Sequence, residues 1–278
     1  MAEERKNCGV MDWGVVPYAQ ACAWQAELVA RRQAGELPDL LILCEHPAVI
    51  TLGRNARREN VQASAEELAA RGVEVHTTKR GGDVTYHGPG QLVGYPIIHL
   101  GGWHKDVVAY VRALEEVLMR AVREFGVEGR RKTAAAGRPA AAGRRQLYTG
   151  VWVGNEKLAA IGVHIARWVT SHGFALNVTT DLSYFDFIVP CGIADKRVTS
   201  LERLLALGSS AHGLPPVGSG HSDPSGRGRW VGLVGAELMA ALKAAVVQRF
   251  GEVFERQMTT IEPDEWEVWL GAHEAAAS

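Results

Sequence analysis

Cys191 lies where a thiol could be presented as a nucleophile. Pro190 restricts the backbone before it, and Gly192 leaves the backbone after it unobstructed. A thiolate attacks carbonyl carbons readily, and a nearby lysine or histidine cation would lower the pKa of the thiol. Most free cysteines are instead small buried hydrophobes, and the local sequence alone slightly favours that second interpretation.

Lys157 is the candidate partner of this thiol. It begins an apolar run, residues 157–162, directly after a turn expected at Gly154 and Asn155. Most lysines at such positions are solvated strand ends. If the side chain is covered, desolvation would favour its neutral form, whereas a neighbouring thiolate would favour its charged form. That competition suits a residue that accepts and returns a proton, and the spacing leaves open whether Lys157 and Cys191 meet.

A glycine-rich segment, RGGDVTYHGPGQ at residues 80–91, lies between two β-like stretches. Its four glycines remove the Cβ atoms that would keep this backbone away from a ligand or from another backbone. For glycines alone, tight turns are the more frequent explanation. Arg80 and His87 add a cation and a polar ring, which strengthens the alternative that the segment binds a ligand.

The histidines do not identify a site by themselves. A lone histidine is more often structural than catalytic, and this holds separately for each candidate, which are His46, His87, His164 and His172. They lack a ligand signature such as HExxH, and the cysteines are unpaired in sequence, so we expect no metal site.

The composition is that of an ordinary globular protein. Of 278 residues, 47% are apolar and 22% are charged, and no apolar run reaches the roughly 18 residues of a membrane span. The formal net charge of −1 argues against nucleic acid as a main partner. Residues 1–6 lack the features of a secretory signal, and the four cysteines form no disulfide framework. We expect a cytoplasmic monomer with reduced thiols.

Apolar spacing predicts the elements that must position these residues. Helices are expected over residues 17–33, 106–125 and 235–250, a buried strand over 40–44, and a hairpin formed by 151–153 and 158–161. This mixture predicts one α+β domain over residues 1–278, with a mixed β-sheet and flanking helices. Residues 131–147 and 207–229 are low in complexity and predicted as loops, and residues 230–278 are predicted as a C-terminal helical part.

Together these segments closely resemble the lipoate–protein ligase B family of octanoyltransferases. The matching motifs occur in family order and cover roughly residues 12–205. They are EHP (45–47), TLGR (51–54), RGGDVTYHGPGQ (80–91), KLAAIG (157–162), RWVTSHGFALN (167–177), PCGI (190–193) and VTSL (198–201). The resemblance implies an α+β fold related to the catalytic domains of biotin protein ligases and lipoate ligases.

The resemblance also implies roles for residues. Cys191 corresponds to the acyl-thioester nucleophile, and Lys157 corresponds to the partner that lowers the pKa of the thiol and transfers protons. The substrate-contacting positions that it implies are Arg80, Gly81, Gly82, Asp83, Val84, Thr85, Tyr86, His87, Ala160, Ile161, Gly162, Gly173, Phe174 and Ala175.

The resemblance further implies the reaction and the partners. The donor would be octanoyl acyl carrier protein, which carries the acyl group on phosphopantetheine, and no other cofactor is expected. The acceptors would be lysines on lipoyl domains of 2-oxoacid dehydrogenase complexes and on the glycine cleavage H protein. We hypothesise that an apolar tunnel holds the eight-carbon chain, because each buried methylene contributes about 0.8 kcal/mol.

Three other functions remain as alternatives. An ATP-dependent lipoate or biotin ligase could share the fold and would not need Cys191. A non-catalytic acyl-binding module would be expected to lack Cys191 or Lys157, yet both are present. A cysteine hydrolase would replace the amine by water, but the chain has no recognisable Cys–His–Asn signature.

Overall fold

The computed structural model describes residues 6–132, 149–189, 197–211 and 233–270. These residues form an eight-stranded mixed sheet, ordered β10-β8-β9-β6-β2-β1-β11 with β7 paired to β8, and a three-stranded sheet ordered β4-β3-β5. The strands are β1 (Lys6–Val15), β2 (Asp39–Glu45), β3 (Val49–Leu52), β4 (Glu74–Thr77), β5 (Val84–His87), β6 (Gln91–Ile97), β7 (Gly150–Val153), β8 (Glu156–Ala166), β9 (Val169–Asn177), β10 (Arg197–Val198) and β11 (Arg256–Thr260).

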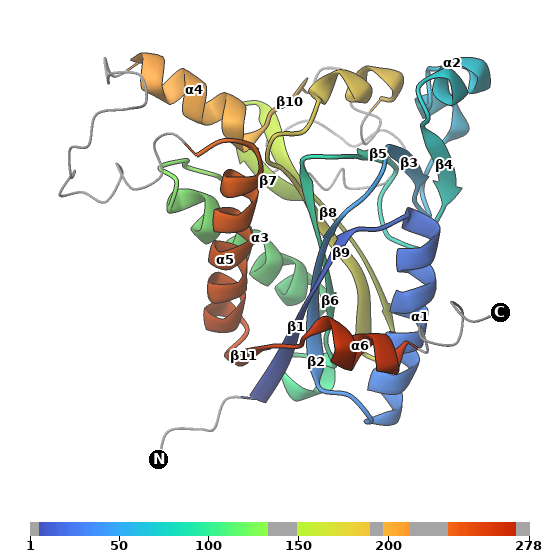
Figure 1. Ribbon diagram of the computed structural model, residues 1–278, viewed down its shortest axis with the longest axis vertical. Coiled ribbons are helices and arrows are strands. Elements are labelled where there is room, and N and C mark those ends of the chain that lie inside the picture. Colours follow the sequence, from blue (N-terminus) through green and yellow to red (C-terminus); the bar gives the residue numbers. More distant parts are fainter. Residues whose placement is uncertain (1–5, 133–148, 190–196, 212–232, 271–278) are drawn as a thin grey trace, which may run out of the picture.

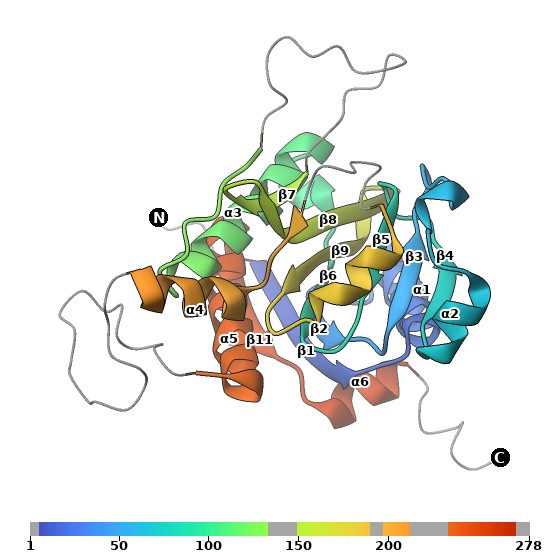
Figure 2. The same ribbon diagram turned by 90° about the horizontal axis from the view of Figure 1, so that it is seen from above.

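Helices cover both faces of the large sheet. The described helices are α1 (Tyr18–Ala34), α2 (Ala65–Ala70), α3 (Val107–Arg123), α4 (Leu201–Ala211), α5 (Gly235–Val253) and α6 (Pro263–Trp269), of which α2 packs on the three-stranded sheet instead. Helices α3 and α5 pack on one face, and α1 lies on the other face together with α6 (Figure 1). The view from above shows the three-stranded sheet beside the large sheet, on the side of α1 (Figure 2). The expected α+β fold, with a mixed sheet and flanking helices, is confirmed.

The helices and strands predicted from apolar spacing are present. The prediction for 106–125 corresponds to α3, where Leu114, Val117 and Leu118 are completely buried and Asp106 caps the first turn through the amides of Val108 and Ala109. The continuous apolar run 40–44 lies in β2, between antiparallel β6 and parallel β1, where both of its faces are buried. The predicted hairpin corresponds to β7 and β8.

Two predictions about the second half of the chain are partly wrong. The segment 207–229 was expected to be a loop, but α4 continues through residue 211, because Leu204 and Leu205 pack on the main core and support the helix. The C-terminal part 230–278 was expected to be helical, but it also contains β11, which pairs in parallel with β1. Residues 133–147 and 212–229 of the predicted loops lie outside the described residues.

A buried ion pair fixes the edge of the large sheet formed by β1, β2 and β11. Asp39 accepts hydrogen bonds from the Nε atoms of Arg256 and Arg32, both at 2.9 Å, and from the amide of His99. Asp39 and Arg256 are 3% and 4% exposed, so the desolvation of each charge is offset mainly by the other.

None of the described helices is long and apolar enough to cross a bilayer. The assignment of residues 1–278 to one domain stays a prediction from the sequence.

Candidate active site

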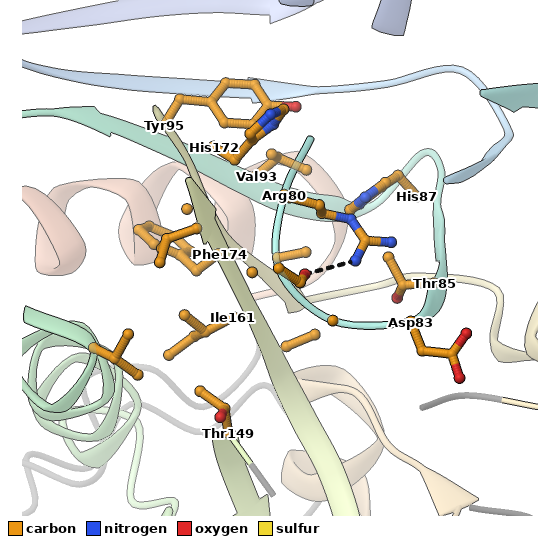
Figure 3. A pocket seen from close by; sticks show the side chains of 18 of the residues that line it. Arg80, Asp83, Thr85, His87, Val93, Tyr95, Thr149, Ile161, His172 and Phe174 are labelled. Atoms are coloured by element: carbon orange, nitrogen blue, oxygen red, sulfur yellow. Dashed lines mark hydrogen bonds between the residues drawn. The ribbon is translucent and has the colours of Figure 1, made fainter. Parts of the chain in front are cut away.

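A cavity of about 540 Å³ opens between the glycine-rich segment, strands β6, β8 and β9, and the N-terminal ends of α1 and α3. Figure 3 shows Arg80, Thr85 and His87 on one side of the strands that cross this cavity, and Ile161, Phe174 and Thr149 on the other. Two of the predicted positions are not in its lining, because Tyr86 points elsewhere and Cys191 lies outside the described residues. The other predicted positions line it, and these are Arg80, Gly81, Gly82, Asp83, Val84, Thr85, His87, Lys157, Ala160, Ile161, Gly162, Gly173, Phe174 and Ala175. Their roles as substrate contacts stay predictions.

Tyr86 does not line the cavity. The segment 80–91 is interrupted by β5, and successive side chains of a strand point to opposite faces. The Tyr86 ring is buried away from the cavity, stacked on Tyr184 with 5.0 Å between ring centroids and in edge contact with Phe185. Tyr86 therefore anchors β5 in a satellite core, which Ile50, Leu68, Val73, Val84, Phe185 and Ile188 also form, rather than contacting a ligand.

Glycines allow residues 80–83, the glycine loop, to lie directly against β8 and the turn after β3. A Cβ atom on Gly162 would stand 2.9 Å from the carbonyl oxygen of Gly81, and one on Gly53 would stand 2.5 Å from that of Gly82. The amide of Gly81 donates to the carbonyl of Val163 at 2.9 Å. Close approach between backbones is therefore the physical reason for glycine at these positions.

Arg80 is a buried cation that the protein itself binds. Its Nη2 donates to the carbonyl oxygen and hydroxyl of Thr51 at 2.7 and 2.8 Å, and its Nη1 donates to the carbonyl of Gly81 at 3.1 Å. The guanidinium thus ties the glycine loop to β3.

Asp83 carries a carboxylate that is bound in the same way. Its Oδ1 accepts from the amides of Val84 and Arg57, and its Oδ2 accepts from the side chain of Asn60 at 2.6 Å. These bonds orient the rim of the cavity, and the carboxylate is not free to act as a general base without losing them.

Lys157 lies at the start of β8 with its side chain against the cavity. It is 9% exposed, and its Nζ stands 4.9 Å from the centroid of the Trp152 ring. It is the only lysine among the described residues that line the cavity. Its position agrees with the alternative in which this side chain is covered, and not with a solvated strand end.

Cys191 falls in 190–196, outside the described residues, so its contact with Lys157 stays a prediction. The described residues on either side of that segment form backbone contacts next to the cavity. Val189 donates its amide to the carbonyl of Asn60 at 2.8 Å, while β10 pairs Val198 with Lys157. The chain thus meets the strand of Lys157 a few residues after Cys191.

One wall of the cavity carries neutral polar rings that the sequence analysis did not assign to the site, although it considered His46 and His172 as single candidates. Tyr18, Tyr95 and His172 line it. Behind them His46, although fully buried, donates from Nδ1 to the carbonyl of Val16 at 2.7 Å, so its Nε2 accepts from the Tyr95 hydroxyl at 2.6 Å. No single motif groups these residues with one another, because they come from a helix and three separate strands or turns.

Burial keeps the imidazoles at this wall uncharged. It lowers the pKa of His172 to about 4 and that of His87 to about 3, with the positive charge of Arg80 as a further cause for both. Burial likewise lowers the pKa of His46 and raises the pKa of the Tyr95 hydroxyl. The wall therefore offers hydrogen-bonding groups but carries no charge on these rings at pH 7.

The opposite side of the cavity is apolar. Val107 and Val111 of α3 line it together with Ile161 and Phe174. The apolar stripe of α3 predicts a core-facing helix, but it did not indicate that the first turns of this helix face a cavity. The described residues contain no group of three or more His, Cys, Asp or Glu side chains that could hold a metal ion.

Comparisons with known proteins identify a family and several relatives that this chain resembles. The sequence-family model of the lipoyl protein ligase A/B catalytic domain matches residues 17–212. Among curated proteins, the octanoyltransferase of Solibacter usitatus is 53% identical over 199 residues, which cover 72% of this chain and 84% of that protein. The octanoyltransferase of Acidobacterium capsulatum is 54% identical over 202 residues, which cover 68% of this chain and 77% of that protein.

Solved structures share the fold at much lower identity. A lipoate-protein ligase A bound with ATP gives a TM-score of 0.67 at 14% identity, and the match covers 98% of this chain and 95% of that one. A putative lipoate protein ligase from T. acidophilum with bound lipoic acid gives a TM-score of 0.65 at 14% identity, covering 97% and 95% of the two chains.

Proposed function

The chain belongs to the lipoyl protein ligase A/B catalytic-domain family, and from this membership we infer an octanoyltransferase that supplies octanoyl groups for protein lipoylation. Its relatives with that name are about half identical to it, whereas the ligases of known structure share its fold at 14% identity. The observation that supports this reaction within the site is Lys157, a buried amine beside a mostly apolar cavity and the glycine loop.

We propose that Cys191 carries the acyl group. Its thiolate attacks the thioester carbonyl of octanoyl acyl carrier protein, the new carbon–sulfur bond forms, and the bond to the phosphopantetheine sulfur breaks. The leaving thiolate then takes up a proton. One thioester replaces another, so the step has little net free-energy cost. The ammonium of Lys157 near Cys191 would stabilise the attacking thiolate.

The second step transfers the octanoyl group to a lysine of a lipoyl domain. Such an amine has an ordinary pKa of about 10.4, so it must lose a proton before it attacks the Cys191 thioester. The amine loses that first proton to solvent. In this proposal Lys157 takes up the second proton, which the nitrogen loses as the amide forms, and passes it to the cysteine sulfur as the carbon–sulfur bond breaks. Backbone amides at the glycine loop are candidate donors to the oxyanion of each tetrahedral intermediate.

The apolar side of the cavity is the proposed site of the alkyl chain. Ile161 and Phe174 of β8 and β9, with Val107 and Val111 of α3, provide a surface that a saturated chain can cover. No cofactor beyond the phosphopantetheine of the donor is needed for these steps. The acceptors we propose are lipoyl domains of 2-oxoacid dehydrogenase complexes and the glycine cleavage H protein, and the cytoplasmic location stays a prediction.

Intact-mass analysis after incubation with octanoyl acyl carrier protein tests the mechanism. The wild-type chain should gain one octanoyl group, Cys191→Ser should gain none, and Lys157→Ala should gain it far more slowly. Cys22→Ser is the matched control, because Cys22 is partly exposed and does not line the cavity. Absence of the octanoyl increment on the wild-type chain would refute the covalent mechanism, and an adduct on Cys191→Ser at the wild-type level would move the nucleophile elsewhere.

A further inference from the structure

A continuous chain of buried hydrogen bonds connects the glycine loop to Lys157. Its members are between 0% and 8% exposed, and in order they are Arg80, Thr51, His87, Gln91, Asn177 and Thr199. The chain crosses from β3 and β5 of the small sheet to β6 and β9 of the large sheet, so it links two sheets that meet at the cavity.

The first half of this chain leads from the glycine loop to β6. Arg80 donates from Nε and Nη2 to the Thr51 hydroxyl, and that hydroxyl faces His87 Nε2 at 3.4 Å. His87 Nδ1 then donates to Gln91 Oε1 at 2.7 Å. Because Thr51 already accepts from the guanidinium, its own hydrogen is directed to the imidazole.

The second half leads from β6 to the strand of Lys157. Gln91 Nε2 donates to Asn177 Oδ1 at 2.9 Å, and Asn177 Nδ2 donates to the carbonyl of Thr199 at 3.0 Å. Thr199 in turn donates its amide to the carbonyl of Lys157 at 3.0 Å. Each member therefore donates in the direction of Lys157.

The direction of these bonds is determined by the two ends. A guanidinium can only donate, and a backbone carbonyl can only accept. Between such ends, neither amide can rotate without placing two donors or two acceptors face to face. The imidazole must also stay neutral to accept at Nε2, and burial provides for this by lowering the pKa of His87 to about 3. Aligned bonds of this kind strengthen one another in a buried environment.

Gln91 and Asn177, in the middle of the chain, do not line the cavity, and they pair directly across β6 and β9. We propose that these six residues form a positioning relay, in which Gln91 and Asn177 hold Lys157 at a fixed distance from the glycine loop without touching the substrate. The relay rests on the proposed function, because it acts through Lys157 and the loop. A displacement of about 1 Å at a reacting group can cost about 10²-fold in rate.

Two substitutions interrupt the relay at different bonds. Gln91→Met keeps the approximate length of the side chain but removes both its donor and its acceptor. Asn177→Asp keeps the shape, and its carboxylate still accepts from Gln91 but cannot donate to Thr199. Thr170→Val is the matched control on β9, because it removes two buried hydrogen bonds, to the carbonyl of Pro96 and from the amide of Ile98, away from the relay.

The measurement separates positioning from folding. Intact-mass analysis after long incubation with octanoyl acyl carrier protein gives the fraction of acylatable chains, and kcat and KM for transfer to a lipoyl domain are expressed per acylatable chain. We expect both relay variants to lose about 10²-fold in kcat with KM within twofold of wild type. Thr170→Val should keep the wild-type kcat per acylatable chain, even if fewer chains are folded.

Each result decides the question. If the lower rate of the relay variants is accounted for by a smaller acylatable fraction, or if KM changes while kcat does not, the six residues are structural and the relay is overturned. If the wild-type chain itself takes up no octanoyl group, the proposed function fails and the relay falls with it. An acylated wild type with fully active relay variants refutes the relay alone.

Discussion

The neutral histidines of the cavity wall predict a specific loss of stability in mild acid. Burial is the largest cause that lowers the pKa of His87 to about 3 and of His172 to about 4, whereas both should titrate near the ordinary value of 6.5 in the unfolded chain. Between about pH 6.5 and pH 4 the unfolded chain therefore binds more protons than the folded chain. The free energy of unfolding must fall as the pH falls through this window.

The magnitude at pH 5 follows from the unfolded state. An imidazole that is mostly protonated when unfolded and neutral when folded makes folding less favourable by about 2 kcal/mol at that pH, and by only a few tenths of a kcal/mol at pH 7. This difference hardly depends on the folded-state pKa, provided that it lies well below 5. His87 and His172 together should reduce the free energy of unfolding by about 4 kcal/mol between pH 7 and pH 5.

Urea denaturation of wild type and His172→Asn at both pH values measures this effect. Residue 172 has a φ of 55°, a left-handed conformation that asparagine adopts more readily than most residues. The variant should lose about 2 kcal/mol less than wild type between pH 7 and pH 5. His104→Asn, at an exposed position, should behave as wild type does. Equal losses in wild type and His172→Asn would show that His172 is not held neutral, and would refute the reasoning.

Three further predictions concern the edge of the sheet, the glycine loop and the cavity. Asp39→Asn leaves the buried Arg256 without its carboxylate and should lower the free energy of unfolding by about 3–5 kcal/mol. Urea denaturation measures this loss, and a loss under about 1 kcal/mol would contradict the prediction. Gly162→Ala puts a methyl group 2.9 Å from the Gly81 carbonyl and should slow octanoyl transfer about 10²-fold, whereas Gly154→Asn, in open space, should not. Donors with six, eight and ten carbons should differ in turnover, and equal rates would show that the cavity does not measure chain length.

Much of the scaffold could be predicted because it depends on local periodicity. The stripe of α3 and the continuous apolar run of β2 each carry their own signal over enough residues to be recognised. β11 could not be recognised in the same way. Its sequence, RQMTT, is short and mostly polar, and it becomes a strand because β1 offers it an edge. Pairing partners far apart in the chain supply information that no local window contains.

The site shows the same division. Nearly all of the site positions predicted from the motifs line the cavity, but the motifs did not show which way each side chain points, and they did not identify lining residues such as Tyr18, Tyr95 and Val111. Tyr86 points to the satellite core because successive side chains of β5 point to opposite faces. The glycines on both sides of β5 made the whole segment look like a ligand-binding loop, so the strand was not recognised. Tyr95 and His172 meet at the cavity because β6 and β9 are neighbours in the sheet, and this adjacency is a property of the fold alone.

The hydrogen bonds that already engage Arg80 favour a neutral acyl group over a free acid beside the glycine loop. Among the described residues that line it, the cationic side chains are Arg80 and Lys157, because burial keeps His87 and His172 neutral. Arg80 directs its donors to Thr51 and to the carbonyl of Gly81, so a carboxylate would have to compete with bonds that hold the glycine loop to β3. A thioester brings no charge into these surroundings, and its alkyl chain matches the surface formed by Ile161 and Phe174. A thioester donor, as proposed above, would therefore leave the bonds of Arg80 intact, whereas a free acid beside Arg80 would compete with them.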